Sequence, residues 1–218
     1  MGRFLFIDAL FAGALFGAWY FWFAGYNRRK GAWALRWVTT ALAGRARVVE
    51  VEWLGNGLLR ARLRFPAHWF EHACVTVRLL PRAFPVHWVL GAWRKHKETL
   101  TFEADLDSAP GFHLDVVRHR WLSRSHHGLL AGPSRNWTIS RPGPIVLTTR
   151  AEWTQELTAL VNSLMTSRGH SLLSVHFRPQ SPHFTASLPL EALTDQEVSA
   201  GFLNILRELA AGASAHQR

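Results

Sequence analysis

The sequence is poor in cysteine and in acidic residues. Among 218 residues there is one cysteine, Cys74, and 15 aspartates and glutamates stand against 25 lysines and arginines. A single cysteine excludes an internal disulfide and a cysteine-rich zinc site within the chain. The composition therefore favours a cytosolic compartment for the folded part of the protein.

Three signature motifs of catalysis are also missing. The chain contains no G-x-S-x-G turn, no G-x-x-x-x-G-K-[ST] phosphate loop and no G-x-G-x-x-G loop after a strand. The motif-based arguments for hydrolase, phosphate-loop and dinucleotide chemistry therefore fail. We expect a protein that is not an enzyme, and we assign it no cofactor and no metal.

Apolar residues are abundant, and they are concentrated near the N-terminus. The run from Phe4 to Phe23 carries one charge, Asp8. Its length is what an α-helix needs to cross the ~30 Å hydrocarbon core of a bilayer, so we predict a membrane span. A cleaved signal peptide is disfavoured, because the run is too long and no A-x-A site precedes the basic cluster that begins at Arg28.

The charge around the span predicts its orientation. Arg3 alone precedes it, whereas nine basic and two acidic residues lie between Arg28 and Arg64. Positively charged flanks stay on the cytoplasmic side, so we predict a single-pass membrane protein with its N-terminus outside and its C-terminal domain in the cytoplasm. This concentration of charge favours anionic lipid headgroups over nucleic acid as the partner.

Aromatic and basic residues at the cytoplasmic end predict where the chain meets the headgroups. The predicted membrane-interface residues are Trp19, Tyr20, Trp22, Tyr26, Arg28, Arg29, Lys30, Trp33, Arg36 and Trp37. The last three belong to a helical stretch that we expect to lie along the interface or to pack on the domain.

Within the span, small residues recur every fourth position at Ala9, Gly13 and Gly17. Such a face lets another helix approach closely. One interpretation is a homo-oligomer or a membrane-protein partner, and the other is the general abundance of glycine and alanine in membrane helices.

The clearest strand pattern lies between Val48 and Phe65. Apolar residues alternate with Glu50 and Glu52 before Gly55-Asn56-Gly57 and with Arg60, Arg62 and Arg64 after it. We predict a β-hairpin with a three-residue loop, which sets Glu52 opposite Arg60 and Glu50 opposite Arg62. The arginine row is then partly neutralised, which favours a solvated sheet face over a nucleic-acid stripe.

Further alternating segments predict an α+β fold, with a transmembrane helix followed by an antiparallel-sheet domain. The additional strands are expected at 75–80, 99–106, 112–117, 172–177 and 184–190, with one at the start of the C-terminal half. Thr149 with Glu152, and Thr194 with Glu197, match capping boxes, so two C-terminal amphipathic helices are expected to pack on the sheet.

These predictions divide the chain into six parts. They are a transmembrane anchor at 1–27, a juxtamembrane interfacial helix at 28–44, a β-rich half at 45–123, a loop or linker at 124–144, a β-α-β-β-α half at 145–213 and a tail at 214–218.

One short motif argues for chemistry. His68, Glu71 and His72 match H-x-x-E-H, in which two histidines one helical turn apart bind zinc and the glutamate serves as base. Against a metal-dependent hydrolase, twelve histidines make such spacings common by chance, and the segment leaves little room for a helix. His113 and His176 fall on the polar faces of their strands and are expected to face solvent.

The leading hypothesis is therefore a membrane-anchored accessory or scaffold subunit with a cytoplasmic α+β domain. The alternatives are a membrane-tethered hydrolase that uses the histidine-glutamate motif and nucleic-acid binding by the arginine-rich hairpin.

Overall fold

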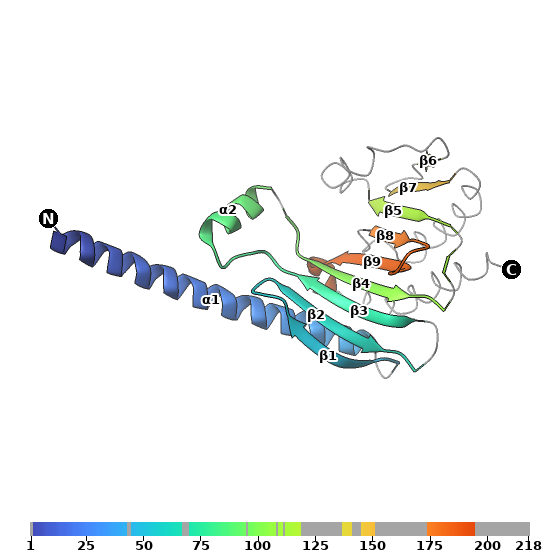
Figure 1. Ribbon diagram of the computed structural model, residues 1–218, viewed down its shortest axis with the longest axis horizontal. Coiled ribbons are helices and arrows are strands. Elements are labelled where there is room, and N and C mark those ends of the chain that lie inside the picture. The colour runs from blue at the N-terminus through green and yellow to red at the C-terminus, as the bar shows by residue number, and fades with distance from the viewer. Residues whose placement is uncertain are drawn as a thin grey trace.

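The computed structural model contains a long N-terminal helix and a large antiparallel sheet, which confirms the predicted α+β class (Figure 1). It describes residues 2–42, 45–66, 70–94, 96–107, 109–110, 112–118, 137–140, 145–150 and 174–194. The elements are α1 (Gly2–Leu42), β1 (Arg47–Trp53), β2 (Leu58–Arg64), β3 (Glu71–Arg78), α2 (Pro85–Trp93), β4 (Thr99–Asp105), β5 (Leu114–Arg118), β6 (Trp137–Ser140), β7 (Ile145–Arg150), β8 (Ser174–Phe177), β9 (Phe184–Pro189) and a 3-10 helix η3 (Leu190–Thr194).

The described strands form one sheet in the order β1-β2-β3-β4-β9-β8-β5-β7-β6, and every neighbouring pair is antiparallel. The β8-β9 hairpin is inserted between β4 and β5, which follow one another in the sequence (Figure 1). The two predicted halves therefore share a single sheet and are not separate units.

The helix α1 is longer than predicted. The sequence suggested a span that ends near residue 27 and a separate interfacial helix at 28–44, but α1 runs unbroken from Gly2 to Leu42. The separate helix is therefore wrong. Gly31 lies in the middle of α1, and one glycine costs a helix only about 1 kcal/mol relative to alanine, which packing against the sheet readily offsets.

The β1-β2 hairpin has the predicted register. Glu50 pairs with Arg62, Glu52 pairs with Arg60, and Trp53 faces Leu59 across the turn. Gly55 adopts a φ of +84°, a left-handed conformation that glycine takes without a steric penalty. A bulge at Val49, between the paired residues Val48 and Glu50, interrupts the otherwise regular alternation of β1.

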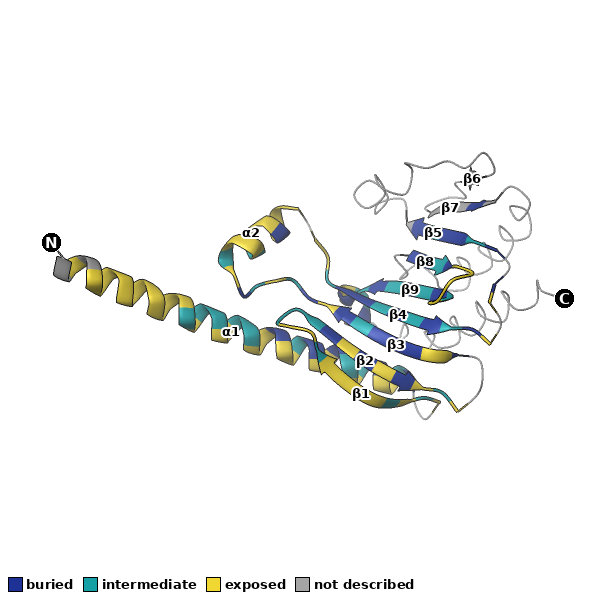
Figure 2. Ribbon diagram, viewed as in Figure 1, coloured by how far each residue is buried: buried dark blue, intermediate teal, exposed yellow. Residues whose placement is uncertain are grey.

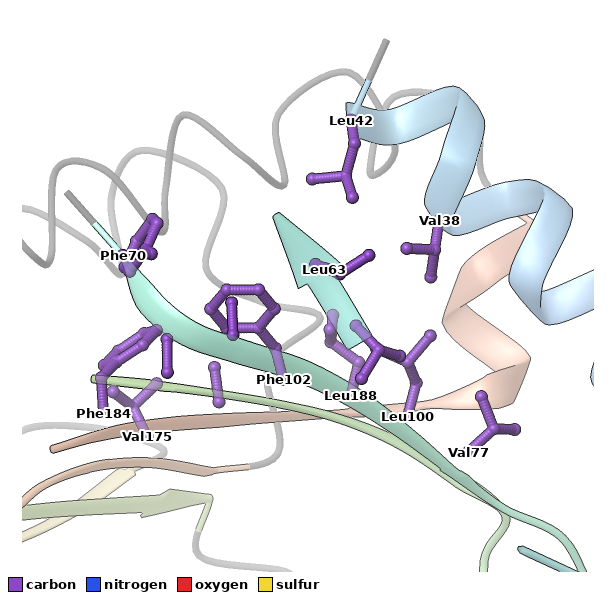
Figure 3. Close-up of a cluster of buried hydrophobic side chains, with 14 of the residues drawn as sticks. Val38, Leu42, Leu63, Phe70, Val77, Leu100, Phe102, Val175, Phe184 and Leu188 are labelled. Atoms are coloured by element: carbon purple, nitrogen blue, oxygen red, sulfur yellow. The ribbon is translucent and has the colours of Figure 1, made fainter. Parts of the chain in front are cut away.

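One face of the sheet forms the hydrophobic core together with the second half of α1. Ala34, Val38 and Leu42 of α1 are at most 1% exposed, and Figure 3 shows Val38 and Leu42 pointing toward the buried residues of the sheet. Further core residues include Leu63, Leu100, Phe102, Phe184 and Leu188. The C-terminal half of α1 is thus a structural part of the domain.

Two predictions concern the C-terminal half. The segment 124–144 was predicted to be a loop or linker, but the strand β6 lies within it and pairs with β7. The two helices predicted after Thr149 and after Thr194 lie outside the described residues. Up to Thr194 the structure has a 3-10 helix, η3, which ends where the second of these helices was expected to begin.

Candidate membrane interface

The first half of α1 presents an apolar surface that the rest of the described chain covers only in part, near Phe16, Trp19 and Phe23. Within the described residues, α1 is the one helix long and apolar enough to cross a membrane. Figure 2 shows that the N-terminal half of this helix is largely exposed, whereas buried and intermediate residues alternate with exposed ones in its C-terminal half. The large exposed apolar residues of this half are Phe4, Phe6, Ile7, Leu10, Phe11, Leu15, Phe16, Phe21, Trp22 and Tyr26. Both the length and the exposure of this half suit a membrane span.

The aromatic residues at the end of this surface divide into two groups. Trp22 and Tyr26 are exposed, at 76% and 45%. Trp19 donates a hydrogen bond from Nε1 to the Arg82 carbonyl at 3.1 Å, and the Tyr20 hydroxyl accepts one from the Asn56 amide at 2.8 Å. Trp19 and Tyr20 therefore join the helix to the domain. Tyr26 does so in part, because the Arg82 guanidinium lies 4.9 Å from the centroid of its ring, and Trp22 is largely exposed.

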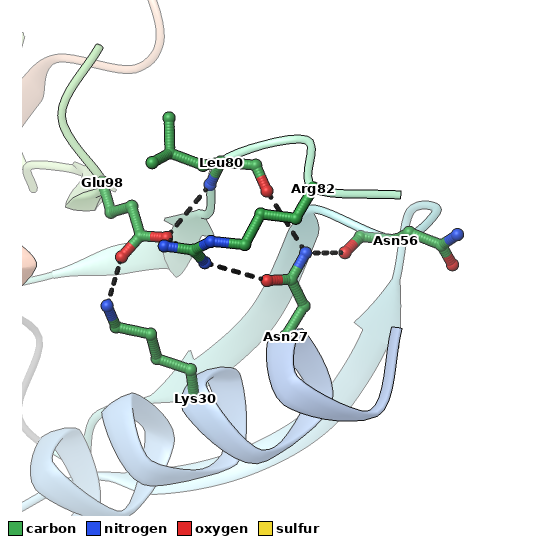
Figure 4. A network of polar contacts seen from close by, with 6 residues as sticks. All are labelled: Asn27, Lys30, Asn56, Leu80, Arg82 and Glu98. Atoms are coloured by element: carbon green, nitrogen blue, oxygen red, sulfur yellow. Dashed lines mark hydrogen bonds and ion pairs between the residues drawn. The ribbon is translucent and has the colours of Figure 1, made fainter. Parts of the chain in front are cut away.

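A buried polar network lies where α1 meets the sheet (Figure 4). Asn27 is 1% exposed, and its amide nitrogen donates to the carbonyls of Asn56 at 2.9 Å and Leu80 at 3.2 Å. Its amide oxygen accepts a hydrogen bond from Arg82 at 3.1 Å. Since each bond crosses from α1 to a loop of the domain, the network fixes how the helix leaves the sheet.

Glu98 is the anionic centre of this network. Its carboxylate binds Lys30 of α1, pairs with Arg82 at 2.7 Å and accepts a hydrogen bond from the Leu80 backbone at 3.2 Å. Burial alone would raise the pKa of Glu98, but the hydrogen bonds from Lys30 and Leu80 and the charge of Arg82 outweigh it and lower the pKa. Glu98 is therefore held ionised between two cations.

The structure separates the predicted interface residues. Arg28 and Arg29 are exposed at the end of the apolar surface, whereas Lys30 is turned toward Glu98. Arg36 lies about 15 Å further along the helix than Tyr26, at 1.5 Å per residue. Trp37 packs against the hydrophobic core of the domain. Residues 31–42 follow the span directly in the sequence, but α1 carries them away from its exposed apolar surface and along the sheet.

The small-residue face of the span is open. A Cβ atom built on Gly13 or Gly17 would meet nothing within 4 Å. Among the residues that the structure describes, none covers Gly13 or Gly17, so this face of the helix is open there. Gly31 differs, since a Cβ there would lie 2.5 Å from the ring of Trp53.

The helix that the histidine-glutamate motif requires is absent at Glu71 and His72. Glu71 and His72 lie in the strand β3, and His72 adopts a φ of +45° at a bulge, while His68 lies outside the described residues. The motif requires a helix, which would place both histidines on one side. Among the residues that the structure describes, no three metal-binding side chains come together.

The histidines on the polar face of the sheet are less exposed than predicted. His176 bonds through Nδ1 to an oxygen of Asp115 at 2.5 Å, and His113 lies 3.8 Å from the other oxygen. Burial would raise the pKa of Asp115, but the hydrogen bond from His176 leads the interactions that lower it. Asp115 and His176 are cross-strand partners, which brings these residues together and withdraws them from solvent.

The arginine row of the hairpin is exposed, and part of it is paired. Arg62 forms an ion pair with Glu50 at 3.1 Å, and Arg60 lies 3.8 Å from the buried sulfur of Cys74. The cross-strand neighbours of these two arginines are Glu50, Glu52, Cys74 and Thr76. None of these neighbours is aromatic, so they offer no side chain on which a nucleic-acid base could stack.

Three of the residues that join the span to the sheet were not predicted from the sequence: Asn27, Arg82 and Glu98. Arg82 and Glu98 both lie more than fifty residues after Asn27 in the chain, and the only local signal is a lone asparagine at the end of an apolar run. Comparisons with protein-family models and with curated proteins find no match for this chain.

Proposed function

We propose that this chain is a single-pass, membrane-anchored accessory or scaffold protein whose α+β domain is held at the cytoplasmic surface of the bilayer. The observation that carries this proposal is the division of α1 into two halves. Its first half is exposed and apolar, and its second half belongs to the core of the domain. A helix built in this way transmits its position in the membrane directly to the sheet, without a flexible linker.

The proposed orientation rests on charge. Arg28 and Arg29 lie exposed immediately after the span, and such residues are retained on the cytoplasmic side. The network around Glu98 supports a defined angle between the membrane and the sheet. A scaffold requires a fixed orientation relative to the membrane, because it has to present the same surface to its partner.

Alkaline extraction of cell membranes, combined with a reporter, tests this proposal. We expect the full-length chain to stay in the membrane pellet and a reporter fused after Arg218 to be protected from protease in intact cells. As a control, Leu10→Arg together with Leu15→Arg should release the chain, since each arginine costs the helix about 3 kcal/mol on insertion. Extraction of the unaltered chain would refute membrane anchoring, and an accessible reporter would refute the orientation.

We further propose that the open face at Ala9, Gly13 and Gly17 binds a second transmembrane helix, either of another copy or of a membrane partner. Gly13→Leu together with Gly17→Leu should abolish cross-linking of the span to that helix, because leucine prevents close approach. Leu10→Ala together with Leu15→Ala is the matched control. Equal cross-linking in all three chains would show that this face is not the contact.

A further inference from the structure

The helix α2 exposes an unusual amount of apolar surface. Residues Pro85–Trp93 include no aspartate, glutamate, lysine or arginine, and Gly91 is the one buried residue of this helix. The exposed apolar residues of α2 and its N-cap are Phe84 (49%), Val86 (68%), Val89 (57%), Leu90 (39%) and Trp93 (81%). Exposure of five large apolar side chains on one short segment marks a surface that is covered by something other than water.

Ring contacts place α2 beside the span. Phe84 lies 6.1 Å from Phe16, and Trp88 lies 5.9 Å from Trp19 and 6.3 Å from Phe23, measured between ring centroids. Figure 1 shows α2 projecting from the sheet on the side from which the N-terminal half of α1 emerges. The apolar surface of α2 is therefore continuous with that of the span.

The depth of α2 follows from these contacts. Phe16 lies about 10 Å inside the end of the span at Phe23, at 1.5 Å per residue, and half of the hydrocarbon core is about 15 Å thick. If α1 crosses the bilayer, α2 cannot remain in water while its Phe84 touches Phe16.

The residues around α2 suit a segment that enters and leaves one leaflet. Arg82 precedes it and is fixed to Glu98 at the junction. Arg94 and the basic residues up to Lys97 follow it, with Arg94 exposed. Glu98 neutralises Arg82, so the N-terminal end of α2 is anchored to the domain, whereas the exposed Arg94 suits the anionic headgroup layer at its C-terminal end.

From this continuity of apolar surface and the flanking charge, we infer that α2 is a second membrane element, inserted into the acyl layer of the leaflet that faces the domain. The protein is then held by the span and by α2 together, which prevents the domain from rotating about the axis of the span. This inference rests on the proposed membrane anchoring.

Lipid quenching of a single fluorescent label tests the insertion of α2. The full chain, with Cys74→Ser as background, receives an NBD label at Val89→Cys and is reconstituted in phosphatidylcholine vesicles that contain phosphatidylglycerol. Leu15→Cys in the span is the control for membrane depth, and Val49→Cys on β1 is the aqueous control. Emission is compared between vesicles with and without doxyl groups on the lipid acyl chains, and a water-soluble quencher is then added.

The inference predicts that doxyl lipids lower the emission of the labels at residues 89 and 15 by about twofold, while the label at 49 responds to the aqueous quencher alone. A quenched label at 15 with a water-accessible label at 89 would overturn the insertion of α2 and leave the anchor intact. A label at 89 shielded from both quenchers would also overturn it and would indicate a protein contact. Failure of the label at 15 to be quenched by lipid would instead refute the membrane anchoring.

Discussion

Replacing Glu98 by alanine is expected to lower the free energy of unfolding by about 3 kcal/mol, because it leaves buried cations without their partner. The side chain of Glu98 is 8% exposed, and that of Arg82 is 13% exposed. Lys30, at 29%, can turn partly toward water, so its share of the loss is smaller. Denaturant unfolding of the chain in detergent micelles measures the effect.

Two further variants distinguish the loss of the buried charge of Glu98 from the loss of its side-chain volume and from the loss of an exposed carboxylate. Glu98→Gln keeps the shape of the side chain and an acceptor for Leu80, so the expected loss is smaller than for alanine. Glu191→Gln removes a carboxylate that is 79% exposed and 3.4 Å from Lys97, and it should change little. Similar losses for Glu98→Ala and Glu191→Gln would contradict a stabilising role of the network.

The lowered pKa of Glu98 also makes the free energy of unfolding depend on pH. Because the folded state lowers the pKa of Glu98 below its ordinary value of 4.5, its contribution is complete above that value and is lost as the pH falls through the lowered pKa. The free energy of unfolding should therefore decrease below about pH 4.5, and less steeply in Glu98→Gln. Asp115, whose pKa is also lowered, adds a similar decrease to both chains.

Replacing Gly31 by leucine is expected to destabilise the domain by about 2 kcal/mol, because α1 and the sheet are too close there for a side chain. A Cβ at this position would lie 2.5 Å from Cη2 of Trp53, 3.0 Å from its Cζ2 and 3.4 Å from a methyl of Leu59. Trp53 itself packs against the core and cannot retreat freely. The gain in helix propensity, about 0.8 kcal/mol, offsets only part of this clash.

Gly25 supplies the matched control. It lies in the same helix, and a Cβ built there would meet nothing within 4 Å. Gly25→Leu should therefore leave the free energy of unfolding unchanged or slightly higher. If both leucine variants unfold at the same denaturant concentration, then α1 does not pack on the sheet as described.

Local patterns in the sequence predicted the parts of the fold that depend on neighbouring residues. The alternation on both sides of Gly55-Asn56-Gly57 correctly gave the pairing of Glu50 with Arg62, because the length of a hairpin loop sets the register. The apolar run from Phe4 to Phe23 likewise indicated a helix of membrane length. Both signals lie within about twenty residues of chain.

Contacts between distant segments were not predictable in this way. Nothing near β4 indicates that β9, more than seventy residues later, pairs with it. The partners of Glu98 are Lys30 and Arg82, which only the folded chain brings together. The motif at Glu71 and His72 was disfavoured for a local reason, since the segment leaves little room for a helix, and the structure has a strand there.

The positions of the basic residues after the span were also not predictable from local sequence alone. Its residues are consecutive with a membrane anchor, which suggested a headgroup contact throughout. Because α1 continues as a straight helix, only Arg28 and Arg29 stay at the end of the apolar surface, and Trp37 becomes part of the core packing. Conversely, α2 is remote in sequence from the span yet touches it through Trp88.

In the proposed membrane-bound protein, one unbroken helix joins a membrane span rigidly to the core of the domain. The distance between spin labels at Leu15→Cys and Val49→Cys, measured by pulsed electron resonance in nanodiscs with Cys74→Ser as background, tests it most directly. About 40 Å of helix separates Leu15 from the end of α1, which suits this method. We expect one narrow distance distribution, which broadens in Gly31→Leu. A broad distribution in the parent chain would show that the span moves independently of the domain and would refute the rigid connection.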